Sequence, residues 1–272
     1  MSVEPPSALG GALGDIVAAR HRRILELARN AGKVSVDGLA EALSVTPQTI
    51  RKDLNMLSAR SLLSRVHGGA VTVSGVDNIA YAERRAMASG IKDALGAAAA
   101  ALIPNGASLF INIGTTTEAV ARHLGGHREL MVITNNMNVV DLLNDHRALE
   151  LVMVGGRVRT SDRAVVGALA MAFIQNFRVD YALIGTSAID VGGDFLDFDM
   201  DEVQVSQTII RGARKVILVA DSSKVGRPAP VRVGHLREID YLVSDRIIDP
   251  ELRALCAQHE VTLIETDVGE RR

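Results

Sequence analysis

Residues 45–57 read VTPQTIRKDLNML, and wound as a helix this stretch has two unlike sides. The apolar side carries Ile50, Leu54 and Leu57. The opposite side is polar and positive, with side chains at i, i+3, i+4 and i+7 spacing: Gln48, Arg51, Lys52 and Asn55. Such a helix is suited to pack on a core with one side and to present groups for phosphates and base edges on the other.

Local signals predict where this helix begins and what precedes it. Thr46 is placed to cap it, and Pro47 fits its first turn, where a missing N–H costs nothing. Two earlier helices are predicted over 16–30 and 36–43, the second capped by Ser35, with a short break at 44–45. Two short helices joined by so tight a turn are typical of a helix-turn-helix, whose second helix enters the major groove.

A hairpin is predicted directly after these helices. LLSRV (62–66) and AVTV (70–73) flank the turn His67-Gly68-Gly69, which indicates a two-stranded wing. We therefore expect a winged helix-turn-helix over 16–73 that contacts double-stranded DNA. The candidate contact residues are Thr46, Gln48, Thr49, Arg51, Lys52, Asn55, Arg65 and His67. The helix over 45–57 by itself could simply have a charged face exposed to solvent. The order of two helices, a turn, a basic helix and a hairpin is what favours DNA binding.

Composition agrees with a globular protein of two domains. The chain has 272 residues, is 47% hydrophobic and has a net charge of −2, yet residues 1–75 hold nine Lys and Arg against six Asp and Glu. No apolar run approaches the roughly 20 residues of a membrane span. Residues 1–15 resemble a flexible tail without a secretion signal, so we expect a cytoplasmic protein. The single cysteine, Cys256, excludes an intramolecular disulfide and is expected to be buried.

Short apolar strands alternate with helical segments over 91–272, after a linker predicted over 74–90. The strands are SLFINIG, LMVITNN, LELVMVGG, DYALIGTS, KVILVADSS, DYLVSD and VTLIET. Their near-continuous Val, Ile and Leu content predicts a largely parallel sheet covered by helices. The fold class of this domain is α/β.

Small polar residues follow five of these strands. In open α/β sheets ligands lie outside the carboxyl ends of the strands, and a strand-to-helix turn can hold an anion at the helix N-terminus. Although any one such turn is ordinary, five on one sheet edge favour a small phosphorylated, polyhydroxylated ligand. The candidate effector-binding residues are Asn112, Gly114, Thr115, Thr116, Asn135, Asn136, Gly155, Gly156, Gly185, Asp221 and Lys224.

Signals for catalysis, metals and cofactors are absent from the sequence. There is no phosphate-binding P-loop, no GxGxxG fingerprint and no histidine spacing typical of a metal site. Four acidic residues in GGDFLDFDMDEV, namely Asp197, Asp199, Asp201 and Glu202, are expected to lie in a solvated loop rather than to bind a divalent cation. We expect neither an enzyme, nor a cofactor, nor a metal.

The sequence resembles the DeoR family of bacterial transcription regulators from about Arg20 onward. SVTPQTIRKDLNML followed by RVHGGAV carries the resemblance in the first domain, and INIGTTTEAV, VITNN, VGG and VADSSKVGR carry it in the second. The resemblance implies a sensor domain similar in fold to ribose-5-phosphate isomerase and CoA transferases. It also implies a repressor that binds its operator as a homo-oligomer, dimer or tetramer, and releases it when a phosphorylated metabolite binds.

Three longer stretches resemble the members of this family that control glycerol or glycerol-3-phosphate metabolism, and the resemblance implies glycerol 3-phosphate as the effector. They are IPNGASLFINIGTTTEAVARHL, VVGALAMAFIQNFRVDYALIG and FLDFDMDEV. Two positions depart from the family pattern: Asn112 stands where Asp is usual, and the stretch around Ser206 lacks a basic residue that is common there. These departures leave open a different sugar or polyol phosphate as the effector.

Two further alternatives belong to other classes of protein. An enzyme acting on a sugar phosphate would use the same turns, but the sequence shows no paired acid and base. A DNA-architectural protein would show no ligand effect on DNA binding, and the polar turns argue against it. For the repressor, a helix from about Glu83 to Leu102 is our candidate for carrying the signal between the domains.

Overall fold

The computed structural model describes residues 19–21, 23–28, 33–59, 64–66, 68–71, 81, 89–247 and 249–266. The chain divides into two compact units, residues 1–79 and 80–272. Several expectations lie outside the described residues: the tail over 1–15, His67, most of the linker over 74–90, and the first part of the helix expected from Glu83. Of the Arg65 side chain, likewise, nothing is described.

The smaller unit is a winged helix-turn-helix, as the sequence predicted. Its described elements are a helical stretch over 19–21 and 23–28, β1 (Lys33–Ser35), α2 (Val36–Ala42), α3 (Pro47–Ala59), β2 (Ser64–Val66) and β3 (Gly69–Val71). The wing was expected to have two strands, but β1 pairs with β3 to give a three-stranded sheet in the order β1-β3-β2. The three-residue β1 lacks an alternating pattern long enough to reveal a strand in the sequence.

Caps and core positions in this unit follow the sequence. Ser35 Oγ accepts a hydrogen bond from Gly38 N at 3.1 Å, and Thr46 Oγ1 accepts from Thr49 N at 3.2 Å, which confirms both predicted caps. The predicted apolar side of α3, with Ile50, Leu54 and Leu57, lies in one core that also includes Ile24, Ala28, Val36, Leu39 and Ala40. At the wing, a Cβ on Gly69 would lie 2.0 Å from the Val34 carbonyl oxygen, so the close approach of β3 to β1 requires glycine.

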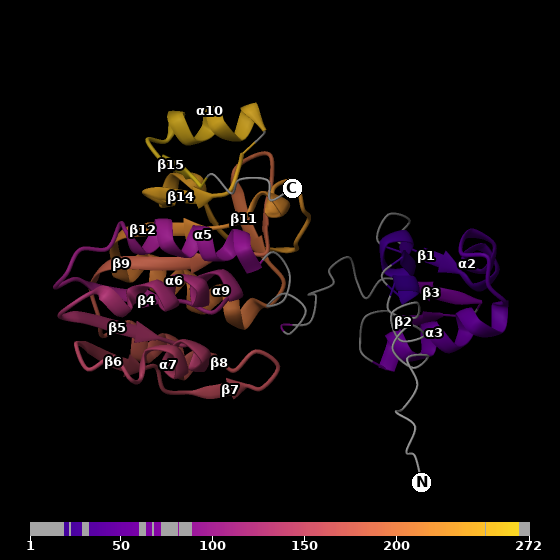
Figure 1. Cartoon of the computed structure of the whole chain (residues 1–272), viewed down its shortest axis with the longest axis horizontal. Coiled ribbons are helices and arrows are strands. Elements are labelled where there is room, and N and C mark those ends of the chain that lie inside the picture. The colour runs from indigo at the N-terminus through magenta and orange to yellow at the C-terminus, as the bar shows by residue number, and fades with distance from the viewer. Residues whose placement is uncertain are drawn as a thin grey trace, which may run out of the picture. The chain divides into compact units, whose positions relative to one another are not determined.

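The larger unit is built on a seven-stranded parallel sheet, which confirms the predicted α/β class (Figure 1). In spatial order its strands are β15 (Thr262–Glu265), β14 (Tyr241–Ser244), β12 (Ala213–Val219), β9 (Val179–Gly185), β4 (Ser108–Ile111), β5 (Leu130–Thr134) and β6 (Leu149–Met153). All six neighbouring pairs are parallel. Each strand overlaps a segment that the sequence predicted as extended, although β9 and β12 begin before the predicted segments.

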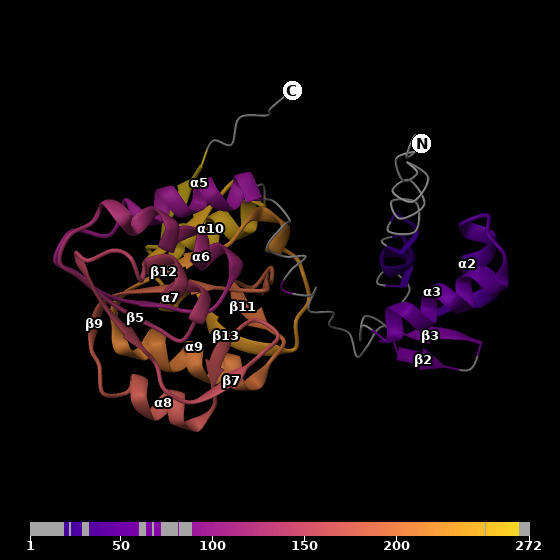
Figure 2. The same cartoon turned by 60° about the horizontal axis from the view of Figure 1, so that its bottom comes forward.

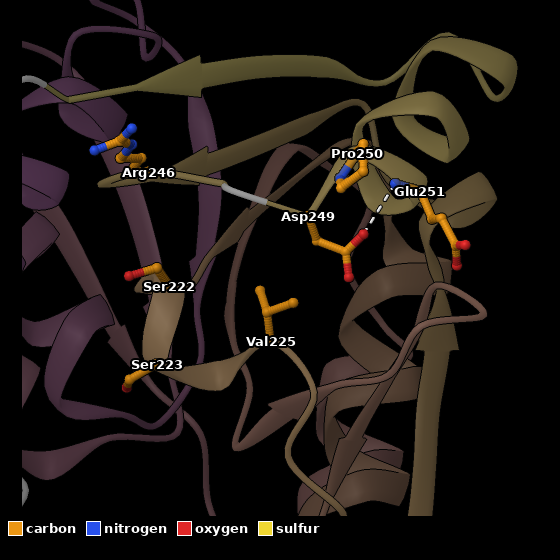
Figure 3. Close-up of a pocket in the computed structure, with 7 residues that line it drawn as sticks. All are labelled: Ser222, Ser223, Val225, Arg246, Asp249, Pro250 and Glu251. Atoms are coloured by element: carbon orange, nitrogen blue, oxygen red, sulfur yellow. Dashed lines mark hydrogen bonds between the residues drawn. The ribbon is translucent and has the colours of Figure 1, made fainter.

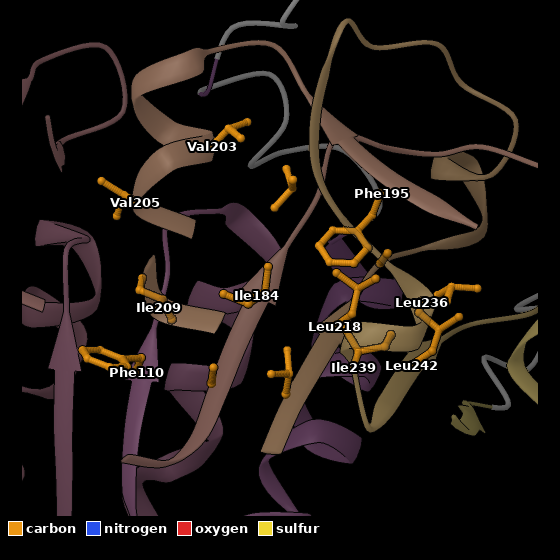
Figure 4. Packing of buried hydrophobic residues seen from close by; sticks show 14 of the residues in the cluster. Phe110, Ile184, Phe195, Val203, Val205, Ile209, Leu218, Leu236, Ile239 and Leu242 are labelled. Carbon is orange, nitrogen blue, oxygen red and sulfur yellow. The ribbon is translucent and has the colours of Figure 1, made fainter. Parts of the chain in front are cut away.

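Helices cover both faces of this sheet (Figure 2). One face packs against α5 (Ser89–Ala100), α6 (Thr115–Arg122) and α7 (Met137–Leu143), through residues such as Leu95, Val120 and Val139. The other packs against α8 (Ala168–Ile174) and α9 (Met200–Gly212), where Phe110, Ile184 and Leu218 of the sheet meet Val203, Val205 and Ile209 (Figure 4). Strands buried on both faces explain the near-continuous apolar runs.

Several smaller elements were not predicted from the sequence. They are η1 (His123–Gly126), the hairpin β7 (Arg157–Arg159) and β8 (Ala164–Val166), the sheet of β10 (Ala188–Ile189), β11 (Asp194–Asp197) and β13 (Val231–His235), the turns η2 (Ser222–Lys224) and η3 (Leu236–Glu238), and α10 (Pro250–Gln258).

Cys256 is 2% exposed, and burial raises the pKa of its thiol. In the described part of the chain, no helix is long and apolar enough to cross a membrane, and no group of three metal-binding side chains occurs.

The acidic segment is not the solvated loop that was expected. Asp197 ends strand β11, and Asp199 caps α9 by accepting a hydrogen bond from Glu202 N at 3.0 Å. Asp197 is 5% exposed. The composition of the segment gave no indication of this arrangement. Acidic residues are seldom buried without a partner, and here the partners lie elsewhere in the chain.

Candidate DNA-binding and effector-binding sites

The outer face of α3 presents most of the predicted DNA contacts to solvent. Four of its side chains are exposed and make no hydrogen bond or ion pair with any other described residue: Gln48, Arg51, Lys52 and Asn55. The hydroxyls of Thr46 and Thr49 lie 2.9 Å apart and serve the start of the helix. Arg65 lies on β2 opposite Ala70 of β3. The face is therefore free to meet DNA, while the two threonines also fix the helix start.

A buried carboxylate holds α3 to the first helical stretch, over 19–21 and 23–28, and no local pattern in the sequence predicts this contact. Asp53 is 2% exposed; Arg20 Nε donates to its Oδ2 at 2.6 Å and Arg20 Nη2 to its Oδ1 at 3.1 Å. His21 Nε2 lies 3.0 Å from the same Oδ1. Burial works to raise the pKa of Asp53, but the hydrogen bonds from Arg20 and His21 outweigh it and keep this pKa below its usual value.

The order of strands in the larger unit creates a topological switch point between β4 and β9. From β4 the chain proceeds outward through β5 to β6, and it returns to β9, beside β4, before proceeding through β12, β14 and β15 on the other side. At such a point the connections leave in opposite directions and open a crevice at the carboxyl ends of the two central strands. The segments that follow β4 and β9 are therefore the first place to look for a ligand.

A pocket lies at this switch point. Its lining residues are Ile113, Gly114, Thr115, Thr116, Gly185, Thr186, Ser187, Asp197, Glu202 and Lys224. Five of the predicted effector-binding residues are thereby brought together: Gly114, Thr115, Thr116, Gly185 and Lys224. The cavity volume is only about 30 Å³, room for a few waters at most, so a ligand the size of a polyol phosphate requires the walls to move apart.

One side of the pocket is electropositive. Helix α6 begins there at Thr115, and its N-cap residue Gly114 supplies no side-chain acceptor for the first N–H groups, which also have no acceptor within the helix. Gly114 has a φ of 141°, a conformation that glycine adopts readily and other residues rarely do. With the ammonium of Lys224 on the same pocket, this side is suited to a phosphate.

The pocket also has an acidic side, formed by two carboxyl groups that were not among the predicted effector-binding residues, Asp197 and Glu202. Asp197 Oδ1 accepts from Ser187 Oγ at 3.0 Å, and Glu202 Oε2 accepts from Arg159 Nη2 at 2.6 Å. Burial, and after it the charge of Asp197, raises the pKa of Glu202 well above its usual range, although Arg159 opposes the shift. Arg159 also contacts Asp162 and Asp199, and one guanidinium cannot neutralise three carboxylates.

The two departures noted in the sequence prove to be one contact. Asn112 Nδ2 donates to Ser206 Oγ at 2.7 Å, and Asn112 Oδ1 accepts from Ile113 N at 2.8 Å. Asn112 is 1% exposed and does not line the pocket. Through these two uncharged hydrogen bonds Asn112 supports the turn after β4. It is not placed to accept a hydrogen bond from a ligand hydroxyl.

The remaining predicted effector residues lie elsewhere. Asn135 Nδ2 donates to Val165 O at 3.1 Å, and Asn136 caps α7 by accepting from Asn138 N. Gly155 and Gly156 line a separate, mainly apolar cavity of about 290 Å³. Asp221 is 5% exposed, caps η2 and accepts from the backbone N–H and hydroxyl of Ser223.

A larger cavity of about 710 Å³ borders η2 and the start of α10 (Figure 3). Its lining residues are Ser222, Ser223, Val225, Arg246, Asp249, Pro250 and Glu251. The N-terminus of α10 is closed by Asp249, which accepts from Glu251 N at 2.9 Å and from Leu252 N at 3.3 Å. Because Asp249 already accepts from these N–H groups, the N-terminus of α10 is less suited to a phosphate than that of α6, which has no side-chain cap.

A winged helix-turn-helix joined to an α/β unit with a polar switch-point pocket defines a ligand-sensing transcription regulator. Comparison with known families agrees: residues 20–76 match the DeoR-like helix-turn-helix domain, and residues 88–246 match the DeoR C terminal sensor domain. The chain belongs to the DeoR family.

Curated relatives align over most of the chain. The chain is 46% identical to the glycerol-3-phosphate regulon repressor of Haemophilus influenzae, over 82% of this chain and 87% of that one. It is 39% identical to the protein of the same name from Escherichia coli, over 90% and 97%. It is 35% identical to the HTH-type transcriptional repressor CsqR of Escherichia coli, over 90% and 94%.

Solved structures with a similar sheet include ribose 5-phosphate isomerase A from Methanocaldococcus jannaschii, at 15% identity and a TM-score of 0.37 over 51% of this chain and 55% of that one. eIF2B delta from Chaetomium thermophilum matches at 13% identity and a TM-score of 0.44, over 59% and 56%. Scores this low support no argument about ligand or activity.

Proposed function

We propose that this protein is a repressor of genes of glycerol 3-phosphate metabolism, which binds operator DNA and releases it when glycerol 3-phosphate binds. The observation that carries the proposal is the alignment, over most of both chains, with two glycerol-3-phosphate regulon repressors. The protein acts as a regulator rather than as an enzyme, and it binds DNA as an oligomer of its own copies.

DNA binding is assigned to α3 and the β2–β3 wing. The exposed face of α3 offers Arg51, Gln48 and Asn55, whose side chains match guanine and adenine edges, together with Lys52 for phosphate. Arg65 and His67 of the wing are assigned to the DNA backbone. Recognition of two half-sites by paired copies would set the spacing of the operator.

Effector binding is assigned to the switch-point pocket. The phosphate is held by the α6 N-terminus and Lys224, and the hydroxyls of the polyol donate to Asp197 and Glu202. A ligand with a phosphate at one end and hydroxyls at the other matches these two sides of the pocket.

The test is operator binding measured by fluorescence anisotropy at fixed salt, with promoter fragments as probes. Glycerol 3-phosphate should release the operator, whereas glycerol, which lacks the phosphate, and inorganic phosphate, which lacks the hydroxyls, should not. Release by glycerol alone would contradict the assigned phosphate site.

A second candidate is the same repressor with a different sugar or polyol phosphate as its effector. The neutral contact between Asn112 and Ser206 favours it, because this contact shapes the turn that begins α6. A panel of sugar phosphates in the same titration separates the two: a stronger response to another phosphate would replace glycerol 3-phosphate.

A further inference from the structure

Tyr81 is the first described residue of the larger unit, and its hydroxyl donates to a buried carboxylate. The hydrogen bond runs from Tyr81 Oη to Glu118 Oε2 at 2.6 Å, and Glu118 is 2% exposed. The other oxygen, Glu118 Oε1, accepts from Asn136 Nδ2 and Asn138 Nδ2, each at 3.1 Å. A buried carboxylate with three such neighbours is costly to leave unpaired, so loss of one partner changes the whole group.

Glu118 connects this group to the pocket through its own helix. It lies in the first turn of α6, the helix whose N-terminal residues Thr115 and Thr116 line the pocket. Because a helix moves as a unit, any shift of α6 that widens the pocket also moves the carboxylate that Tyr81 contacts.

A second connection runs through side chains. Asn138 Nδ2 also donates to the Asp162 carbonyl at 3.1 Å, and the Asp162 carboxylate accepts from Arg159 at 2.9 and 2.5 Å. Arg159 in turn donates to Glu202, which lines the pocket. The chain of contacts from the pocket wall to Tyr81 is therefore Glu202, Arg159, Asp162, Asn138, Glu118 and Tyr81.

The middle of this chain has a defined geometry. Arg163 Nη1 donates to Asn138 Oδ1 at 3.0 Å and to Asp141 Oδ2 at 2.5 Å. Asn138 therefore has its carbonyl oxygen occupied by a donor and its amide nitrogen by two acceptors. A side chain held from both ends cannot turn over without breaking several bonds, so it passes on a displacement of one neighbour to the next.

We propose that occupancy of the switch-point pocket is relayed to the DNA-binding unit through this contact chain, with the hydrogen bond between Tyr81 and Glu118 as its exit. The proposal rests on the proposed function. Its physical basis is the small cavity: a polyol phosphate enters only if the walls move apart, and two of these walls, α6 and Glu202, are tied to Tyr81. A ligand shifts the protein between two states only by contacting them differently, and these contacts are the ones that differ.

The decisive variant is Tyr81→Phe, which keeps the ring and removes only the hydroxyl. The matched control is Tyr181→Phe, which removes a tyrosine hydroxyl from β9, outside the contact chain. Operator affinity is measured by anisotropy for the full-length protein with and without saturating glycerol 3-phosphate, and the ratio of the two gives the coupling. Tyr81→Phe should keep operator binding and lower this ratio roughly 2- to 30-fold, while Tyr181→Phe leaves it unchanged.

A double-mutant cycle tests whether the two ends belong to one route. Arg159→Lys keeps the charge but cannot reach three carboxylates with one planar group, so it should also lower the ratio. If Arg159 and Tyr81 belong to one route, the double variant Arg159→Lys with Tyr81→Phe lowers the ratio by less than the product of the two single effects.

Each outcome is distinguishable. If wild type is not released by glycerol 3-phosphate or by any phosphate of the panel, the proposed function fails and the relay with it. If wild type responds and Tyr81→Phe responds equally, only the relay is overturned, and a lowered melting temperature with an unchanged ratio means that the hydroxyl is merely structural. Independent effects of Tyr81→Phe and Arg159→Lys would overturn the side-chain route and leave α6 as the connection.

Discussion

Arg51 is an exposed guanidinium on the outer face of α3, with no described partner in the protein. If it reads a base, Arg51→Ala should weaken operator binding by roughly 1–3 kcal/mol and weaken random DNA less. The comparison is Arg65→Ala on β2, which should weaken all sequences alike and reduce the salt slope by about one. Anisotropy titrations on operator and scrambled duplexes at several salt concentrations make both measurements. Equal losses on the two duplexes for Arg51→Ala would contradict base reading.

Lys224 lines the switch-point pocket beside the α6 N-terminus. Lys224→Ala should leave operator affinity intact and weaken effector binding by about tenfold or more, because a charge-assisted hydrogen bond contributes roughly 1.5–3 kcal/mol. Calorimetry with glycerol 3-phosphate measures the change. Lys215→Ala is the control, since Lys215 lies near the opposite end of strand β12 from Lys224. Loss of DNA binding by Lys224→Ala would assign this lysine a structural role instead.

At the scale of elements, the position of α3 depends on its buried contact with the first helical stretch, over 19–21 and 23–28. Asp53→Asn removes the charge that Arg20 and His21 hold, and it should destabilise the DNA-binding unit by roughly 1.5–3 kcal/mol. Hydrogen exchange of α3 amides in the full-length protein measures this loss locally. Asp37→Asn on α2, where the residue is exposed, is the control and should change little.

The pKa of Asp53 sets the pH dependence of this effect. Because the folded-state pKa lies below the ordinary value of 3.8, the stabilisation is present above that value and is lost as pH falls through the lowered one. The difference between wild type and Asp53→Asn should therefore stay constant from neutral pH to about 5 and shrink only in stronger acid. If the difference already shrinks between pH 7 and 5, a group other than Asp53 controls the contact between α3 and the first helical stretch.

Elements were predictable where the signals are local. The caps at Ser35 and Thr46, the stripe of Ile50, Leu54 and Leu57, and the strand ending before Gly114 all depend on residues within one or two turns. The β1, β7 and β8 strands were not predicted because each has only three residues, too few for an alternating pattern to show. In addition, β1 pairs only with β3, which lies far along the chain.

At the scale of the whole molecule, effector and operator must influence each other equally. If glycerol 3-phosphate lowers operator affinity by some factor, bound operator lowers the affinity for glycerol 3-phosphate by the same factor. Calorimetric titration of effector into the protein, with and without saturating operator duplex, measures the factor for the effector. This factor is then compared with the factor for the operator from the anisotropy ratio. Scrambled duplex at the same concentration is the control. Unequal factors would show that release involves a further equilibrium, such as a change in oligomer size.

The sequence by itself determined the two-domain plan, the polar face of α3 and the polar turns at the carboxyl ends of the strands, because period, caps and turn chemistry act over neighbouring residues. Only the tertiary structure decided which turns form the pocket. Asn112 meets Ser206 across 94 positions, and Glu202 and Asp197 join Gly114 and Lys224. These meetings depend on β9 returning beside β4, and strand order is set by long-range packing that no local pattern specifies.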